Sequence, residues 1–300
     1  MKQQELIELI RQKQSYLCVG LDPDAEKLPS HLTKDSEGLV AFCKAIIDAT
    51  LPYTVSYKVN SAFFEAFGEA GWRAMREIFI HLKSLPVFAI ADAKRGDIGN
   101  TSGKYAKAFF EDMEADALTL SPYMGEDSIS PFLQYENKTA ILLALTSNPG
   151  HADFEMLKLE NGKRLYEQVL ETSQKWPRKG GLMYVIGATR SEQFAHVRKL
   201  SPDSFFLVPG VGAQGGNLAE ISRLGFNKDI GLLVNASRSI IHAGMGTDFA
   251  EKAAEEAKKM QEEMAGLMGV AFVETGHALS LQQQEQPDHG GWGGKTRNDR

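Results

Sequence analysis

The sequence is poor in cysteine and lacks any long apolar run. Its two cysteines, Cys18 and Cys43, lie within apolar segments, where a free thiol usually packs as a small hydrophobic side chain. No stretch of about 18 uncharged apolar residues is present, so a transmembrane helix is not expected. The first residues, Met1 to Glu5, lack the apolar core of a secretory signal. We therefore expect a cytoplasmic protein that does not contact a membrane.

Patterns for metal ligation and for nucleic-acid binding are also missing. The seven histidines are scattered along the chain, with neither a His-Glu-x-x-His motif nor a Cys-x-x-Cys pair, so no dedicated metal site is expected. Acidic residues outnumber basic ones, 39 to 33, which gives a formal net charge of −6. A nucleic-acid-binding surface would require a basic excess. Any phosphate that this protein binds should therefore belong to a small ligand.

Eight short apolar runs alternate with longer segments of helical spacing. Such alternation predicts a parallel sheet covered by helices, and eight repeats fit closure into a (β/α)8 TIM barrel of one domain. An open doubly wound sheet is the alternative. Polar residues, glycine and proline follow the runs, for example at 22–24 and 147–150, which favours the barrel because barrel enzymes build their sites from these loops. The runs cover residues 16–20, 54–59, 87–91, 117–121, 140–146, 182–187, 204–208 and 230–235.

The C-terminal part of the chain divides into a helix and a polar tail. Apolar residues at helical spacing, together with charged i,i+3 and i,i+4 pairs, predict a final surface helix over residues 250–267. From about residue 276 the sequence is rich in glutamine, glycine and charge, which leaves little apolar surface to bury. We expect a barrel domain over residues 1–275 and a disordered tail over residues 276–300.

Two carboxylates and an ammonium group follow the third apolar run. Asp92, Lys94 and Asp97 stand within the segment 91–98, directly after a run typical of a buried strand. In an extended chain Asp92 and Lys94 would leave the same face, roughly 6.6 Å apart. Gly96 would let the backbone turn and bring Asp97 close. Burying such charges costs several kcal/mol each unless they are paired, so the cluster is either a salt bridge at the end of a strand or a functional site.

A glycine-rich segment follows the seventh run. Residues 210–215 match Gly-x-Gly-x-x-Gly, a motif of dinucleotide-binding domains in which two further strands follow. Only one run follows here, so we exclude nicotinamide binding. In barrels, the loops after the seventh and eighth strands form a recurrent phosphate site, where backbone N–H groups, Gln214 and the guanidinium of Arg238 could hold an anion. A tight turn and a surface arginine are the simpler interpretation of each element alone.

Together these motifs resemble the family of orotidine 5′-monophosphate decarboxylases, in its longer bacterial branch. The resemblance rests on Asp-x-Lys-x-x-Asp-Ile at residues 92–98, on the segment 209–216 and on Ser-Asn-Pro-Gly at 147–150, and it spans residues 15–245 in order. Two departures are present. Asn148 stands where many relatives have histidine, and Ala236-Ser237 precedes Arg238 where many have glycine.

The resemblance implies that the protein converts orotidine 5′-monophosphate to uridine 5′-monophosphate, the last step of de novo pyrimidine synthesis, and that it needs no cofactor. Lys94 would protonate C6 of the pyrimidine within a charge-balanced network that also contains Lys58, Asp92 and Asp97. The implied substrate-binding residues are Asp22 and Lys58 at the ribose, Ser147 at the pyrimidine, and Gln214 and Arg238 at the phosphate, with Ser237 beside Arg238.

The resemblance also implies a homodimer. In this family Asp97, with Thr101 close by, is supplied across a two-fold interface to the site of the partner. An isologous interface of this kind serves both sites at once.

Three other interpretations of the motifs remain open. One is a Mg2+-dependent sugar-phosphate decarboxylase or aldolase of the same barrel type, which uses a similar Asp-x-Lys-x-x-Asp motif. The second is a Schiff-base aldolase with Lys94 or Lys58 as the nucleophile. The third is a non-catalytic nucleotide-binding barrel. The third has no need of the charged network, so the presence of Asp92, Lys94 and Asp97 counts against it.

Overall fold

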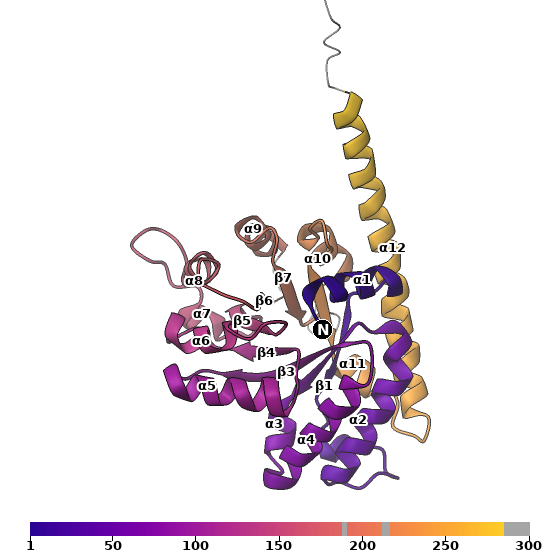
Figure 1. The fold of residues 1–300 in the computed structure, drawn as a ribbon. Coiled ribbons are helices and arrows are strands. Elements are labelled where there is room, and N and C mark those ends of the chain that lie inside the picture. The colour runs from indigo at the N-terminus through magenta and orange to yellow at the C-terminus, as the bar shows by residue number, and fades with distance from the viewer. Residues whose placement is uncertain (188–190, 212–216, 285–300) are drawn as a thin grey trace, which may run out of the picture.

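Eight parallel strands close into a barrel in the computed structural model, which describes residues 1–187, 191–211 and 217–284. The strands are β1 (Leu17–Leu21), β2 (Ser56–Asn60), β3 (Phe88–Arg95), β4 (Ala117–Leu120), β5 (Thr139–Leu145), β6 (Gly181–Ile186), β7 (Phe205–Pro209) and β8 (Leu232–Ala236). Neighbours pair in sequence order, and β1 pairs with β8 to close the barrel (Figure 1). The TIM barrel is therefore confirmed, and the doubly wound sheet is excluded. All eight predicted runs are strands, although β3 continues past residue 91 to Arg95.

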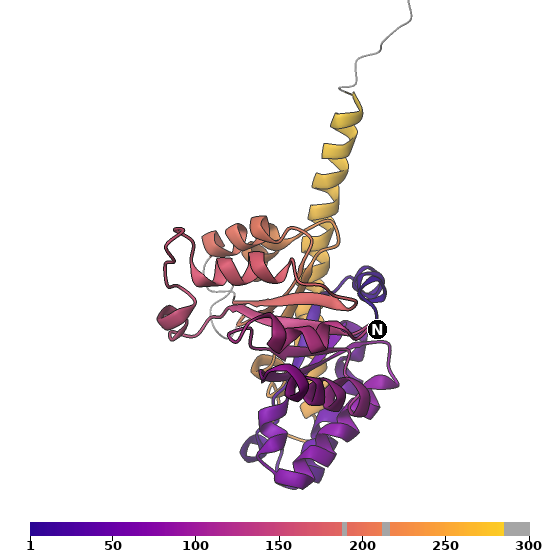
Figure 2. The ribbon, with the colours of Figure 1, turned by 60° about the vertical axis from the view of Figure 1, so that its left-hand side comes forward.

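Helices form the outer layer around this barrel (Figures 1 and 2). Their α-helical bounds are α1 (Gln3–Lys13), α2 (Ser36–Thr50), α3 (Ser61–Glu65), α4 (Gly68–Lys83), α5 (Gly99–Lys107), α6 (Glu126–Leu133), α7 (His151–Phe154), α8 (Leu165–Ser173), α9 (Ser191–Leu200), α10 (Leu218–Gly225), α11 (Arg238–Ile241) and α12 (Phe249–Gln284). Short 3-10 turns cover Ala25–Lys27 and Leu51–Tyr53, and a π-helical turn, Ala108–Asp112, extends α5.

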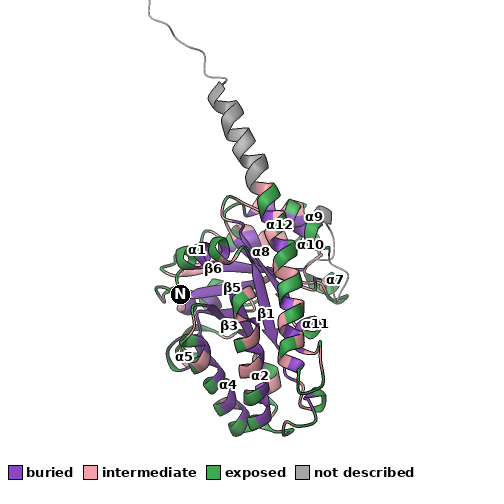
Figure 3. Ribbon diagram, turned by 90° about the vertical axis from the view of Figure 1, so that its right-hand side faces the viewer, coloured by how far each residue is buried: buried purple, intermediate pink, exposed green. Residues whose placement is uncertain are grey.

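The hydrophobic core lies between the strands and this helical layer. Every residue of β1 and of β8 is buried, because a parallel sheet in a barrel is covered on both faces. The longer helices of the first half of the barrel turn an apolar stripe inward, as α4 does with Met75, Ile78, Phe79 and Leu82. Figure 3 shows the result, with buried strands inside and exposed outer faces on the helices. A few polar side chains are buried within this helical layer, among them Thr50, Ser173 and Ser222.

The C-terminal helix α12 packs against α2 and then projects beyond the barrel (Figures 1 and 2). Gln261 ties it to the end of α1, since Nε2 donates to the carbonyl oxygens of Lys13 at 3.1 Å and Gln14 at 3.3 Å. The helix runs past residue 267, its predicted end, to Gln284. It therefore enters the segment 276–300 predicted as a tail, of which residues 285–300 lie outside the described part of the chain. Within the described ranges, no helix is long and apolar enough to cross a membrane.

A buried guanidinium group ties together the amino-terminal ends of β7 and β8. Arg198 of α9 donates from Nε to the carbonyl oxygen of Gly225 at 2.7 Å, from Nη1 to Ser204 at 2.6 Å and from Nη2 to Gly231 at 3.0 Å. Its plane lies over the ring of Phe206, 3.8 Å from the centroid. One side chain thus satisfies carbonyl groups of two connecting segments, α9 to β7 and α10 to β8, which is a structural role at the end of the barrel away from the strand carboxyl ends.

Replacing this residue tests that role. We expect Arg198→Leu to lower the free energy of unfolding by about 3 kcal/mol or more, because it leaves buried carbonyl groups without donors. Urea unfolding followed by circular dichroism measures the loss. The neighbouring exposed Lys199 supplies the control, and Lys199→Met should leave the midpoint almost unchanged. Equal stability of the two variants would contradict the assigned role.

Candidate active site

A cavity of about 250 Å3 opens at the carboxyl ends of the strands. Its wall is divided into two kinds of surface. The segment after β1, strands β2 to β4, strand β8 and the segment after β8 supply charged and polar groups, whereas β5, β6 and β7 supply Leu143, Val185 and Leu207. The polar part of the lining consists of Asp22, Lys58, Asn60, Asp92, Lys94, Thr119, Asn235, Ser237, Arg238 and Ser239.

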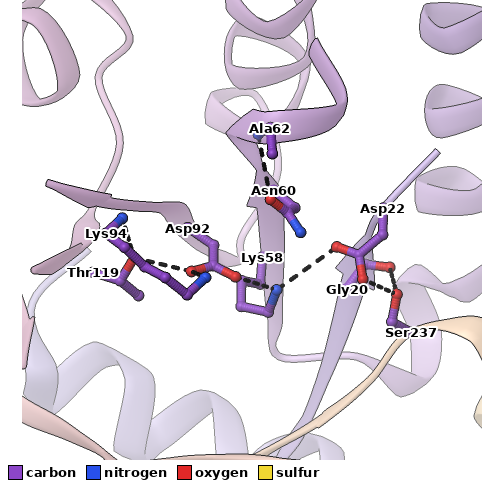
Figure 4. A network of polar contacts seen from close by, with 9 residues as sticks. All are labelled: Gly20, Asp22, Lys58, Asn60, Ala62, Asp92, Lys94, Thr119 and Ser237. Carbon is purple, nitrogen blue, oxygen red and sulfur yellow. Dashed lines mark hydrogen bonds and ion pairs between the residues drawn. The ribbon is translucent and has the colours of Figure 1, made fainter. Parts of the chain in front are cut away.

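The carboxylate of Asp92 is the centre of the charged part (Figure 4). Its Oδ2 accepts a hydrogen bond from Lys58 Nζ at 2.7 Å, and its Oδ1 accepts one from Lys94 Nζ at 2.6 Å. Thr119 Oγ1 donates a third to Oδ1 at 3.0 Å. Burial alone would raise the pKa of Asp92, but the two ammonium groups outweigh it and hold that pKa well below the usual range. Asp92 is therefore ionised at neutral pH.

Lys58 connects Asp92 to a second carboxylate (Figure 4). Its side chain is only 7% exposed, and its Nζ lies 3.8 Å from Asp22 Oδ1 as well as 2.7 Å from Asp92 Oδ2. Burial alone would lower the pKa of Lys58, but the two carboxylates raise it above its ordinary value. Asp22, Lys58, Asp92 and Lys94 thus form a row of alternating charge with no net charge, as expected for charges that are removed from water.

The fourth predicted member of the network, Asp97, lies apart from this row within the single chain. Its Oδ1 accepts a hydrogen bond from the backbone N–H of Ile98 at 2.8 Å, and it does not line the cavity. Thr101 is exposed on α5 and does not line the cavity either. Asp22 instead supplies the second carboxylate beside Lys58.

Lys94 has an unusual backbone conformation, with φ of +46°. The register of β3 and β4 shifts between Ala91 and Arg95, so the chain does not run as a regular strand through Asp92 and Lys94. The expectation that both residues are extended is therefore wrong for Lys94, although the predicted contact between their side chains is present. Lys94 is 51% exposed, and its ammonium borders the open part of the cavity.

The phosphate-binding part of the site predicted from the sequence lies only partly within the described residues. Arg238 is the first residue of α11, is exposed and lines the cavity. Gly210, whose φ is +90°, also lines the cavity. Ser237 is held by β1, since its hydroxyl contacts Asp22 Oδ2 at 2.6 Å and the carbonyl oxygen of Gly20 at 3.1 Å. A Cβ on Gly20 would lie 2.8 Å from Ser237 Cβ, so this approach requires glycine. Gln214 lies outside the described residues.

Ser147 does not line the cavity in this structure. It follows β5 and is half-buried beside Gly187, whose added Cβ would lie 2.8 Å from the Ser147 backbone nitrogen. The preceding residue is anchored by Glu155, which accepts hydrogen bonds from the Thr146 N–H at 2.7 Å and from the Thr146 hydroxyl at 2.8 Å. The predicted pyrimidine contact therefore stands next to the cavity, at an anchored loop, and not within its wall.

Four polar residues of the cavity are not among the predicted site residues, namely Asn60, Thr119, Asn235 and Ser239. The first three stand at the carboxyl end of a strand, or one residue before it, so a polar side chain within an apolar run was the available signal. Asn235 Oδ1 and Asp22 Oδ1 are buried and accept no hydrogen bond. Two buried acceptors that receive no hydrogen bond are suited to the hydroxyl groups of a ligand, even though one of them lies 3.8 Å from Lys58 Nζ.

Clusters that could hold a metal ion are absent from the described residues, where no group of three or more histidine, cysteine, aspartate or glutamate side chains occurs. In the cavity itself, Lys58 lies between the carboxylates of Asp22 and Asp92. The described site therefore uses ammonium groups as the partners of its carboxylates.

A closed parallel barrel whose charged residues gather at the carboxyl ends of the strands defines a TIM-barrel enzyme. The family model described as "Orotidine 5'-phosphate decarboxylase / HUMPS family" matches residues 15–253. The chain belongs to this family.

Individual relatives agree with the family model. A Flavobacterium johnsoniae protein named orotidine 5'-phosphate decarboxylase is 57% identical over 274 residues, which cover 91% of this chain and 100% of the relative. A Christiangramia forsetii protein of the same name is 53% identical over 267 residues, or 88% of this chain and 98% of the relative. The solved structure of Leishmania donovani OMP decarboxylase superposes with a TM-score of 0.75 at 37% identity, covering 87% of this chain and 99% of that one.

The charge row predicts how stability depends on pH. Because the pKa of Asp92 is lower in the folded than in the unfolded protein, its contribution is present above the unfolded pKa of about 4 and is lost as the pH falls below it. We expect Asp92→Asn to lower the free energy of unfolding at pH 7 by about 3 kcal/mol, since two ammonium groups then lack their shared carboxylate. The difference from the wild type should shrink as the pH falls from about 5 to 3.

Urea unfolding at a series of pH values measures this difference. Asp203→Asn is the control, because Asp203 is an exposed carboxylate whose ion pair with Lys228 at 3.3 Å lies on the surface. The free energy of unfolding of Asp203→Asn should equal that of the wild type at every pH. A constant gap between Asp92→Asn and the wild type over the acid range would contradict the low pKa of Asp92.

Proposed function

We propose that this chain decarboxylates orotidine 5′-monophosphate to uridine 5′-monophosphate, the last step of de novo pyrimidine synthesis. The observation that carries the proposal is the carboxylate of Asp92 held between the ammonium groups of Lys58 and Lys94 in the cavity. Family membership and relatives of more than half identity that are named orotidine 5'-phosphate decarboxylase support it. A nucleotide-binding protein without catalysis would gain nothing from this costly row of charges.

We assign the substrate a single orientation along the cavity. Arg238 and the backbone near Gly210 form the end that suits a phosphate, because a guanidinium binds phosphate oxygens with two parallel hydrogen bonds. The oxygens of Asp22 and Asn235 that lack a hydrogen bond within the chain accept from the ribose hydroxyls. The pyrimidine then lies towards Lys94 and the loop that carries Ser147. The apolar wall formed by β5, β6 and β7 faces the uncharged ring and the departing CO2.

In this orientation the carboxylate at C6 of the substrate lies near the ionised Asp92. At a separation of about 4 Å and an effective dielectric of about 20, two like charges repel by roughly 4 kcal/mol. The C6–carboxylate bond breaks, CO2 leaves, and the electron pair stays on C6, which removes the repulsion. The Lys94 ammonium stabilises the developing carbanion and transfers its proton to C6. Repulsion in the ground state and a preorganised field are two descriptions of the same groups.

Two substitutions separate chemistry from binding. We expect Lys94→Ala to lower kcat roughly 1,000-fold or more, because the general acid and a favourable charge are both lost. Arg238→Ala should instead raise KM roughly 10- to 100-fold, since it removes charge-assisted hydrogen bonds far from the reacting carbon. The loss of ultraviolet absorbance of orotidine 5′-monophosphate gives both constants.

Controls address side effects and the metal-dependent alternative. Arg223, an exposed arginine of α10, provides the matched variant Arg223→Ala, which should behave as the wild type. Each assay is repeated with EDTA, and undiminished activity is expected. Full activity of Lys94→Ala would refute the assigned role of Lys94, and loss of activity in EDTA would favour the Mg2+-dependent enzyme.

We further propose that the chain acts as a homodimer in which Asp97 enters the site of the partner. Exposed apolar side chains close to Asp97 support this, because its neighbour Ile98 is 56% exposed and Met124, whose Cε would lie 3.5 Å from a Cβ on Gly96, is 45% exposed. Exposed apolar groups next to a carboxylate that has no role in its own cavity suit an isologous interface. The partner's Asp97 would add a second carboxylate beside Lys94.

Mixing two inactive variants tests the exchange of Asp97. We expect Lys94→Ala and Asp97→Ala each to be inactive, and their mixture, unfolded and refolded together, to recover about a quarter of the wild-type activity. Half of the randomly formed dimers are mixed, and each of these has one complete site. Refolding each variant alone is the control. A mixture with no more activity than its components would contradict the shared site.

A further inference from the structure

The bulge that interrupts β3 stands opposite one residue of β4. Ala91 pairs with Leu118 and Arg95 pairs with Leu120, so three residues of β3 face Thr119 alone. A bulge leaves backbone groups without their ladder partners, because the extra residues have no counterpart in the neighbouring strand. The N–H of Lys94 is such a group. It lies at a strand junction where an unpaired donor would be costly.

The hydroxyl of Thr119 takes the place of the missing ladder carbonyl. Its Oγ1 accepts the hydrogen bond of the Lys94 backbone N–H at 3.0 Å and donates its own hydrogen to Asp92 Oδ1 at 3.0 Å (Figure 4). Asp92 Oδ1 also accepts from Lys94 Nζ. One oxygen atom therefore bridges the backbone of Lys94 and the carboxylate that holds the ammonium of the same residue. Valine would fill the same space, but it could make neither hydrogen bond.

The conformation of Lys94 needs such support. A lysine with positive φ is disfavoured by roughly 1 kcal/mol or more, and it persists only where the surroundings hold it. The next residue is also fixed, since Ser121 N–H donates to the Arg95 carbonyl at 2.9 Å and Arg95 Nη1 donates to the Ala93 carbonyl at 3.2 Å. Thr119 is the residue whose side chain holds the backbone N–H of Lys94.

We propose that Thr119 is a positioning residue for the proton transfer. Its hydroxyl holds Lys94 in the left-handed conformation and orients Asp92, so that the Lys94 ammonium faces C6 of the substrate. This inference rests on the proposed function and on the proposed role of Lys94. A misplacement of about 1 Å can lower a rate roughly 100-fold, so the loss of the hydroxyl should act on turnover more than on binding.

Thr119→Val and Thr119→Ser form the test pair. Valine keeps the shape and removes the hydroxyl, whereas serine keeps the hydroxyl and loses a methyl group. We expect Thr119→Val to lower kcat roughly 10- to 100-fold with KM changed less than about threefold, and Thr119→Ser to keep kcat within about threefold of the wild type. Thr139→Val is the matched control, because Thr139 is buried at the start of β5, at the other end of the barrel.

A second measurement follows the proton directly. In D2O the enzyme should exchange the C6 hydrogen of uridine 5′-monophosphate, because the reverse of protonation uses the same lysine. Nuclear magnetic resonance gives the exchange rate, and we expect it to fall in Thr119→Val by the same factor as kcat. A purely structural role of Thr119 would lower the melting temperature without this parallel loss.

The outcomes separate the inference from the proposed function. If the wild type does not decarboxylate orotidine 5′-monophosphate, the proposed function fails and the inference fails with it. If the wild type is active and Lys94→Ala is inactive, the function stands. In that case, a kcat of Thr119→Val within twofold of the wild-type value overturns the role of Thr119. Equal losses of kcat in Thr119→Val and Thr119→Ser overturn it as well, since the loss would then not be caused by removal of the hydroxyl.

Discussion

The carboxylate of Asp92, shared between Lys58 and Lys94, is the interaction on which the rest of the site depends. A charged group at the end of a buried strand is tolerated because two ammonium groups and a hydroxyl satisfy its oxygens. The same contacts keep the acid ionised and the amine of Lys58 protonated. The barrel supplies the geometry, since adjacent parallel strands bring their carboxyl ends to one rim. The contacts that allow these charges to be buried in the folded protein are therefore the same ones that keep them ionised for catalysis.

The barrel was predictable because its strands are buried on both faces. Such strands appear in the sequence as continuous apolar runs, and the polar residues that follow them mark the functional rim. Asp92 and Lys94 could be recognised for the same reason, as charges that follow directly after an apolar run. Apolar runs and the charged residues after them are visible in the local sequence. The fold and the charged pair Asp92 and Lys94 could therefore be predicted from it.

Features that depend on contacts between strands could not be predicted from the local sequence. The contact of Lys58 with Asp22 requires β2 to lie beside β1, and the contact of Ser237 with Gly20 requires β8 to close on β1. The left-handed Lys94 depends on a register shift against β4, which no spacing within residues 88–95 reveals. The end of α12 was also predicted too early, since the helix continues into a segment whose composition is polar.

The order of the strands has a consequence for how the protein is made. Asp22 directly follows the first strand of the ring and Asn235 belongs to the last, yet both residues line one cavity. A nascent chain on the ribosome therefore has no complete ligand pocket until more than three quarters of its residues have been synthesised. Until then β1 has a free edge, and the growing chain must avoid aggregation through that edge without help from a bound nucleotide.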